Sequence, residues 1–264
     1  MSVALNHRIS GQGDPLILLH GLFGSLENLG GIARRLEGGW QIHALDERNH
    51  GSSPHTDDMD YPAMAEDVIA YLDAQGIEKA SLLGHSMGGK VAMQVALKHP
   101  ERVRSLIVAD ISPVTYKAHH DAILEGMQQM DLRGVTSRSE ADARLAAFVE
   151  MAGVRQFLLK NLERIPAQEQ ADDEVAFRWR LNLSVIDACY DKLAAAPEGQ
   201  GPFEGPVLFI KGADSAYIQE KHRDTIRTLF PGAELKIIEG TGHWLHAEKP
   251  DAFAMLCRRF LEQA

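Results

Sequence analysis

Short apolar runs alternate along this chain with segments of helical spacing, and this alternation restricts the possible folds more than any other feature. Each run is four or five residues long and ends at turn residues, which is typical of a strand buried on both faces of a sheet. The runs cover residues 16–19, 41–45, 80–83, 105–109, 207–210 and 235–238. Apolar residues at helical spacing predict helices over residues 61–75, 87–98, 225–230 and 252–261. Strands that alternate with helices predict an α/β fold with a mostly parallel sheet flanked by helices.

One long segment interrupts this alternation. Residues 114–200 contain no convincing strand, but they do contain helical stretches, for example over 141–162. The segment is too long for an ordinary loop between two strands. We therefore expect a core of residues 1–113 and 201–264, with residues 114–200 inserted as a helical cap before the penultimate strand. Residues 3–9 are expected to add an antiparallel edge hairpin, because no crossover helix fits before Leu16.

Composition excludes several classes of partner. The chain has 27 Lys and Arg against 37 Asp and Glu, a net charge of −10, which argues against nucleic acid and anionic lipid as partners. No run approaches 18 apolar residues, so no membrane span is expected, and the start of the chain does not resemble a signal peptide.

Cys189 and Cys257 form no CxxC pair, which favours two buried free thiols in a cytoplasmic protein. No HExxH motif or Cys/His cluster predicts a metal site, and no feature of the sequence indicates an oligomeric state.

The segment Gly84-His85-Ser86-Met87-Gly88 is a G-x-S-x-G motif between a predicted strand and a predicted helix. In that context the serine sits on a sharp turn that exposes its hydroxyl at the end of the sheet, where it can act as a nucleophile. The small glycines remove side chains that would collide in such a turn, and the helix that follows adds N–H donors near developing negative charge. The alternative, a glycine-rich turn without chemistry, agrees less well with the flanking strand and helix.

A serine nucleophile needs a base, and histidine is the usual one because its pKa lies near neutral pH. His243 follows the last predicted strand and is the first candidate, with His246 as the alternative. A carboxylate should orient this histidine, and both Asp110 and Asp214 follow predicted strands. The other histidines at strand ends, His20, His50 and His85, are more simply explained as hydrogen-bonding partners of the backbone.

An oxyanion hole requires backbone N–H groups that face the position of the developing charge. Met87, directly after the serine, is expected to supply one donor. The second is expected from the loop after the first parallel strand, with Leu22 as the first candidate and Phe23 as the next. Gly21 and Gly24 would allow that loop to approach a substrate closely.

Taken together, these motifs resemble those of the α/β-hydrolase family, and the resemblance covers almost the whole chain. Its elements are His20-Gly21, Asp46-x-Arg48-Asn49-His50-Gly51-x-Ser53, Gly84-His85-Ser86-Met87-Gly88-Gly89-Lys90, Asp110-Ile111-Ser112-Pro113 and Gly242-His243. Within the family the chain is similar to small bacterial cytoplasmic esterases that act on short acyl esters and acyl-CoA thioesters.

The resemblance also bears on individual residues. Many members of the family carry the acid at the position that is Ser215 here, whereas the esterase subgroup carries it at the position of Asp110. The resemblance therefore favours Asp110 over Asp214. It further implies that the inner face of the cap lines the acyl pocket. The expected substrate contacts are Phe23, His85, Trp179 and Trp244, although ordinary packing explains the two tryptophans equally well.

The sequence thus predicts a serine hydrolase that cleaves small-molecule carboxylic esters or thioesters of short to medium acyl chains without a cofactor. The catalytic residues would be Ser86, His243 and Asp110. One alternative is other chemistry on the same residues, such as C–C hydrolysis, perhydrolysis or a lyase reaction. A second is a ligand-binding protein without activity, which would usually have lost one of the three residues.

Overall fold

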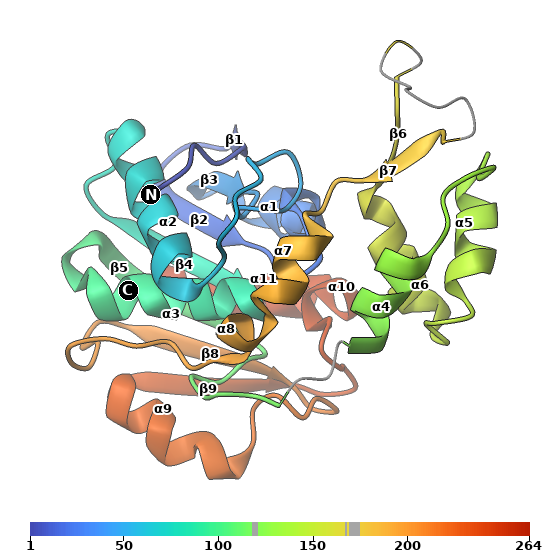
Figure 1. Ribbon diagram of the computed structural model, residues 1–264. Coiled ribbons are helices and arrows are strands. Elements are labelled where there is room, and N and C mark those ends of the chain that lie inside the picture. Colours follow the sequence, from blue (N-terminus) through green and yellow to red (C-terminus); the bar gives the residue numbers. More distant parts are fainter. Residues whose placement is uncertain (118–120, 167, 169–174) are drawn as a thin grey trace.

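A seven-stranded sheet forms the centre of the computed structural model, which describes residues 1–117, 121–166, 168 and 175–264 (Figure 1). Its strand order is β1-β3-β2-β4-β5-β8-β9, and every neighbouring pair is parallel except β1 and β3. The strands are β1 (His7–Ser10), β2 (Asp14–Leu19), β3 (Trp40–Leu45), β4 (Ala80–His85), β5 (Val103–Ala109), β8 (Val207–Gly212) and β9 (Ala233–Ile238). The predicted α/β fold class is confirmed.

The six predicted strands are all present, and the antiparallel strand at the N-terminal edge is present as well. The prediction that this strand forms a hairpin was wrong in one respect. β1 comes directly before β2 in the chain, but it pairs with β3 and not with β2. Both sides of β2 already pair with β3 and β4, so β1 adds to the sheet beyond β3.

Helices cover both faces of the sheet and divide the core into two layers. On one face α2 (Tyr61–Ala74) packs against α3 (Met87–Lys98), and α9 (Arg223–Leu229) adds apolar side chains to the same layer. On the other face α1 (Gly30–Leu36) packs against α11 (Pro250–Leu261), which follows the short α10 (Leu245–Glu248). The four residues 16–19 of β2 are completely buried between these layers, as the continuous apolar run predicts.

A largely helical segment lies between β5 and β8 and extends away from the sheet (Figure 1). It contains α4 (Asp121–Gln129), α5 (Arg138–Leu145), α6 (Ala152–Leu158), α7 (Leu183–Ala188) and α8 (Tyr190–Ala194). The expectation of no strand here was wrong, because β6 (Leu162–Arg164) and β7 (Phe177–Trp179) form an antiparallel pair. Three residues are too few for an alternating pattern to be recognised. The helical stretch predicted over 141–162 is also interrupted, since Met151 is extended and separates α5 from α6.

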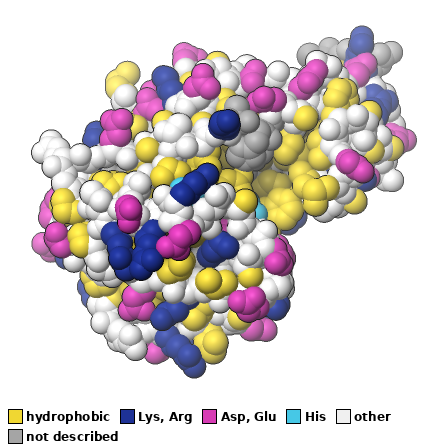
Figure 2. All heavy atoms as spheres, turned by 90° about the horizontal axis from the view of Figure 1, so that it is seen from below, with side chains coloured by type: hydrophobic (Ala, Val, Ile, Leu, Met, Phe, Trp, Pro, Cys, Tyr) yellow, Lys and Arg dark blue, Asp and Glu magenta, His cyan; other side chains and the backbone are white. Residues whose placement is uncertain are grey.

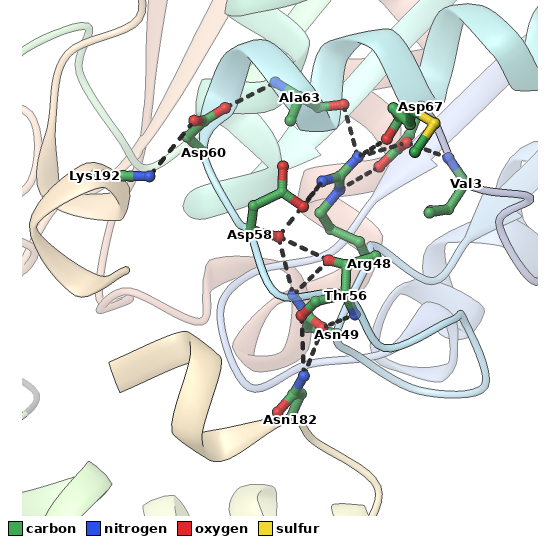
Figure 3. A network of polar contacts seen from close by, with 11 residues as sticks. Val3, Arg48, Asn49, Thr56, Asp58, Asp60, Ala63, Asp67, Asn182 and Lys192 are labelled. Carbon is green, nitrogen blue, oxygen red and sulfur yellow. Dashed lines mark hydrogen bonds and ion pairs between the residues drawn. The ribbon is translucent and has the colours of Figure 1, made fainter. Parts of the chain in front are cut away.

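A polar network ties this segment to the core (Figure 3). Arg48, fully buried after β3, donates to Asp67 of α2 at 2.7 Å and to Asp58 at 2.9 Å. The adjacent Asn49 accepts a hydrogen bond at 3.0 Å from the amide of Asn182, the residue that precedes α7. The Asp46–Ser53 motif therefore has a structural role, because its side chains connect α2, the loop before it and the residue that precedes α7. No helix in the described part of the chain has the length and apolar character needed to cross a bilayer.

Candidate active site

Ser86 lies on the sharp turn between β4 and α3, as the sequence motif predicts. Its backbone adopts φ 54° and ψ −118°, in the left-handed half of φ space that a residue with a side chain rarely occupies. The turn leaves no room for side chains on either side. A Cβ at Gly84 would lie 2.1 Å from the carbonyl oxygen of Gly88, and one at Gly88 would lie 2.3 Å from that of Leu19. The two glycines are therefore required sterically, and they leave the Ser86 hydroxyl at the carboxyl end of the sheet.

A continuous set of hydrogen bonds joins Ser86, His243 and Asp110. Nε2 of His243 lies 3.0 Å from Oγ of Ser86, and Nδ1 lies 2.7 Å from Oδ2 of Asp110. A carboxylate only accepts, so Nδ1 carries the hydrogen and Nε2 is the acceptor for the serine hydroxyl. This is the tautomer that a general base needs. His246 makes no such contact with Ser86, and its ring packs instead against His85 with centroids 4.3 Å apart.

Asp110 is fully buried and is held from several directions. Its Oδ1 accepts the N–H of Gly212 at 3.1 Å, and its Oδ2 accepts a short hydrogen bond from Ser215 as well as the one from His243. Its own backbone is left-handed, with φ 52°. Asp214 is exposed at the turn after β8, and its backbone N–H donates to Thr241. Of the two predicted acids, the structure brings Asp110 to the histidine.

Two buried histidines shape the loop that follows β2. His50 accepts the N–H of Phe23 on Nε2 and contacts the Arg48 carbonyl through Nδ1. His20 accepts the N–H of Glu47 on Nε2 and contacts the Gly21 carbonyl through Nδ1. Burial lowers the pKa of His20 and lowers that of His50 to about 3, so both rings stay neutral and each provides one donor and one acceptor. These are the backbone-bonding roles that the sequence analysis expected.

This loop brings a second N–H close to the serine. The N–H of Phe23 is occupied by His50, which leaves Leu22 as the loop's candidate donor. In the described part of the chain the N–H of Leu22 donates to no protein acceptor. Met87 is the first residue of α3, so its N–H has no carbonyl partner one turn earlier in the helix. The N–H groups of Leu22 and Met87 are therefore the candidate donors for an oxyanion.

Aromatic rings enclose His243. Tyr217 stacks on the imidazole with centroids 4.1 Å apart and an interplanar angle of 29°. His85 approaches with a centroid separation of 4.7 Å, and its Nε2 donates to the His243 carbonyl at 2.8 Å. Burial lowers the pKa of His85 well below its usual value, and burial lowers that of His246 to about 4. These two neighbouring imidazoles therefore remain neutral near neutral pH.

Two hollows open beside Ser86. The large cavity, of about 370 Å³, is lined among others by Phe23, His85, Ser86, Phe157, His243 and Trp244. The small pocket, of about 50 Å³, is lined among others by Ser86, Met87, Lys90, Ile111, Tyr116 and Leu193. Figure 2 shows hydrophobic side chains gathered where the core meets the α4–α6 region. The site is therefore a hydroxyl, an imidazole and two N–H donors at the meeting point of two mainly apolar spaces.

Three of the four expected substrate contacts, Phe23, His85 and Trp244, line the large cavity. Trp179 lines neither the large cavity nor the small pocket, and its contact with a substrate stays a prediction. It lies on β7, where its indole N–H donates to the carbonyl of Met127 at 3.0 Å, so it holds the helical segment together. The described residues contain no group of three His, Cys, Asp or Glu side chains that could hold a metal ion.

Sequence reasoning missed three contributors to the site. Ser215 bonds the acid, Tyr217 stacks on the histidine, and Asn161 of the helical segment donates to the Phe23 carbonyl at 2.7 Å. For Ser215 a signal existed, because it occupies the position at which many family members carry the acid itself. Nothing in the sequence pointed to Tyr217 or Asn161, because their partners lie far away in the chain.

The chain is similar to several known proteins over nearly its whole length. A family model described as alpha/beta hydrolase fold matches residues 14–250. The sn-1-specific diacylglycerol lipase ABHD11 of Xenopus laevis is 44% identical over 260 residues, which cover 96% of this chain and 81% of the lipase. Esterase YbfF of Escherichia coli K12 is 41% identical over 249 residues, which cover 94% of this chain and 93% of the esterase. Among solved structures, a marine microorganism esterase matches with a TM-score of 0.92 and 38% identity, covering 98% of this chain and 100% of its own.

Proposed function

Because this chain belongs to the α/β-hydrolase fold family, we propose that it is a serine hydrolase that cleaves carboxylic esters or thioesters of short to medium acyl chains. The observation that carries the proposal is the hydrogen-bonded series from Asp110 through His243 to Ser86, with spacings of 2.7 and 3.0 Å. Two relatives named esterase or lipase, at 41% and 44% identity over nearly the whole chain, support hydrolysis of an ester bond.

The proposed reaction proceeds in two halves. His243 Nε2 takes the proton of the Ser86 hydroxyl while Oγ attacks the carbonyl carbon, and the carbonyl oxygen becomes an oxyanion held by the N–H groups of Leu22 and Met87. Collapse of this intermediate breaks the bond to the alcohol or thiol, which leaves with the proton from His243. Water then gives a proton to His243 and attacks the acyl-enzyme, and Ser86 recovers its proton as the acid leaves.

Asp110 supports each step without taking the proton. It fixes the ring of His243 so that Nε2 faces Ser86, and its charge stabilises the imidazolium that forms twice per turnover. The face of Tyr217 lies against the same ring, where the electron-rich surface of an aromatic side chain also favours a cation.

We further propose that residues 114–200 act as a cap over the site. In support, α6 contributes Val154 and Phe157 to the wall of the large cavity, and Asn161 bonds the loop that carries Leu22. We place the reaction in the cytoplasm, since Cys189 and Cys257 are both free and buried.

Hydrolysis of p-nitrophenyl acetate or butyrate by wild type and Ser86→Ala tests the proposal. We expect the variant to lose at least 10³-fold in kcat, because no other nucleophile replaces the serine, and to lose labelling by a fluorophosphonate probe. Equal turnover by the two proteins would remove the proposal. A thermal melt of the variant shows that any loss comes from chemistry and not from unfolding.

A further inference from the structure

Ser86 lies at the junction of the large cavity and the small pocket, and the two differ in their walls. Both include Ser86 and Leu22, so both open at the point where a carbonyl carbon would be attacked. His243 lines the large cavity and is absent from the lining of the small pocket. The small pocket instead includes Met87, the proposed second oxyanion donor.

This asymmetry fixes how an ester would lie. The carbonyl oxygen must face the N–H groups of Leu22 and Met87, and the leaving atom must face Nε2 of His243 to receive its proton. The acyl chain is the remaining substituent on the carbonyl carbon, so it points away from His243. The small pocket borders Ser86 but is not lined by His243, so it is the space that remains for the acyl chain.

We propose that the small pocket holds the acyl group of the substrate and the large cavity holds its alcohol or thiol. This rests on the proposed function, since it takes Ser86 as the nucleophile and His243 as the proton donor. It agrees with the implication of the family resemblance that the helical segment lines the acyl pocket, since Tyr116, Tyr190 and Leu193 of the small pocket lie within residues 114–200. The substrate class is then a short acyl group attached to a bulky leaving group.

The volumes of the two hollows limit the size of the acyl group and of the alcohol or thiol. A group the size of a water molecule requires roughly 10–15 Å³ of such space. The small pocket, at about 50 Å³, therefore accepts roughly four groups, which matches an acetyl to butyryl chain. The large cavity, at about 370 Å³, accepts several times more.

The wall of the small pocket favours an uncharged acyl chain. The hydroxyl of Tyr61 donates to the Leu193 carbonyl, and that of Tyr116 donates to the Tyr217 carbonyl. Nζ of Lys90 donates to the carbonyls of Ala194 and Ala195 and lies 4.8 Å from the ring centre of Tyr116. These polar groups already have protein partners, while Ile111 and Leu193 present apolar surface.

Two substrate series test the proposal with the wild-type protein. The first keeps p-nitrophenol as the leaving group and lengthens the acyl chain from two to eight carbons. The second keeps acetate and enlarges the alcohol from methyl to octyl and 1-naphthyl. We expect kcat/KM to fall at least 10-fold between butyrate and octanoate, because one misfitting methylene in an apolar pocket is worth roughly 10- to 200-fold. No such fall is expected in the acetate series.

Variants on the two walls separate the roles. Ile111→Ala enlarges the small pocket and should raise the octanoate-to-acetate ratio of kcat/KM about 10-fold, while the ranking of alcohols stays the same. Leu193→Ala tests the same wall if Ile111→Ala melts below the assay temperature. Phe157→Ala, on the wall of the large cavity, is the matched control. It should change KM across the alcohol series and leave the ranking of acyl chains as it is in wild type.

The outcomes distinguish this inference from the proposed function. Loss of activity in Ser86→Ala, together with a preference for octanoate that Phe157→Ala abolishes, would overturn the assignment of the two spaces and leave the serine hydrolase intact. Turnover that is unaffected by Ser86→Ala would remove both. A short-acyl preference that Ile111→Ala or Leu193→Ala relaxes supports the assignment.

Discussion

At the scale of single residues, the carboxyl group beside His243 is the most informative feature of the site. Asp110 accepts hydrogen bonds from His243, Ser215 and the Gly212 N–H while fully buried, so its orientation is fixed on every side. Asp214 lies two residues after the end of β8, directly before Ser215 in the sequence, and it is exposed to solvent. Burial and hydrogen bonding, rather than residue type, separate the two candidates.

Asp110→Asn should lower kcat for p-nitrophenyl butyrate by as much as roughly 10⁴-fold, because an amide at this position favours the wrong tautomer of the histidine. Steady-state kinetics of both variants measure the effect. Asp214→Asn is the matched control and should stay within about twofold of wild type. The reverse order of effects would contradict the assignment of the acid.

At the scale of elements, Lys90 connects α3 to α8. Its side chain leaves α3 one turn after Ser86 and ends on two carbonyl groups at the end of α8, with only 1% of the residue exposed. A neutral amine retains two hydrogens, so both carbonyls stay bonded whether or not the side chain is charged. Burial lowers the pKa of Lys90 from 10.5 to about 7.

This shift predicts how stability depends on pH. Below about pH 7 the folded and unfolded states both hold the proton, and the folded state carries the full cost of burying the charge. Between about pH 7 and 10.5 the unfolded chain binds the proton and the folded chain does not, so the free energy of unfolding rises with pH. Lys90→Met should remove this rise, on the order of a few kcal/mol over the whole window.

Urea denaturation of wild type and Lys90→Met at pH 6, 7, 8 and 9 measures the difference. Lys98→Met is the matched control, since Lys98 is exposed at the end of the same helix. If the difference in the free energy of unfolding between wild type and Lys90→Met stays constant from pH 7 to 9, the prediction is contradicted.

The elements also show how far the sequence determines this fold. The six predicted strands and the helix over 87–98 were predictable because each depends on a local pattern, namely a continuous apolar run or helical spacing. The nucleophile turn was predictable for the same reason. Burial on both faces was wrongly expected for β9, which lies at the edge of the sheet with Leu235 and Ile237 half exposed. β6 and β7 were not predictable, because two three-residue strands are stabilised by each other and by a cross-strand ion pair between Glu163 and Arg178 at 2.6 Å. The contacts of Tyr217 and Asn161 with the site likewise depend on residues brought together only by the fold.

At the scale of the whole molecule, Arg48 joins several distant parts of the chain. Its guanidinium group contacts Asp67 on α2, Asp58 in the preceding loop and the Met1 carbonyl, and its neighbour Asn49 bonds Asn182. Both charges of the Arg48–Asp67 pair are completely buried. Loss of Arg48 therefore leaves the buried carboxylate of Asp67 without its counter-ion.

Arg48→Met should lower the free energy of unfolding by about 3–5 kcal/mol, the usual cost of breaking a buried pair. The matched control is Arg104→Met, which breaks an exposed pair with Asp14 at 2.9 Å and should cost no more than about 1 kcal/mol. Chemical denaturation of the three proteins at one pH measures both values. Similar losses in the two variants would contradict the role of Arg48 as the buried link.

Apart from Leu22 and Ser86, which line both, the two hollows beside Ser86 have walls made of different residues. Phe157 and Trp244 belong to α6 and to the loop after β9, whereas Tyr61 and Leu193 belong to α2 and α8. A library randomised on one wall consequently leaves the other wall's sequence untouched. Laboratory evolution can therefore exchange one half of the preferred molecule while the other half is inherited unchanged, and the two selections can be run in parallel and recombined.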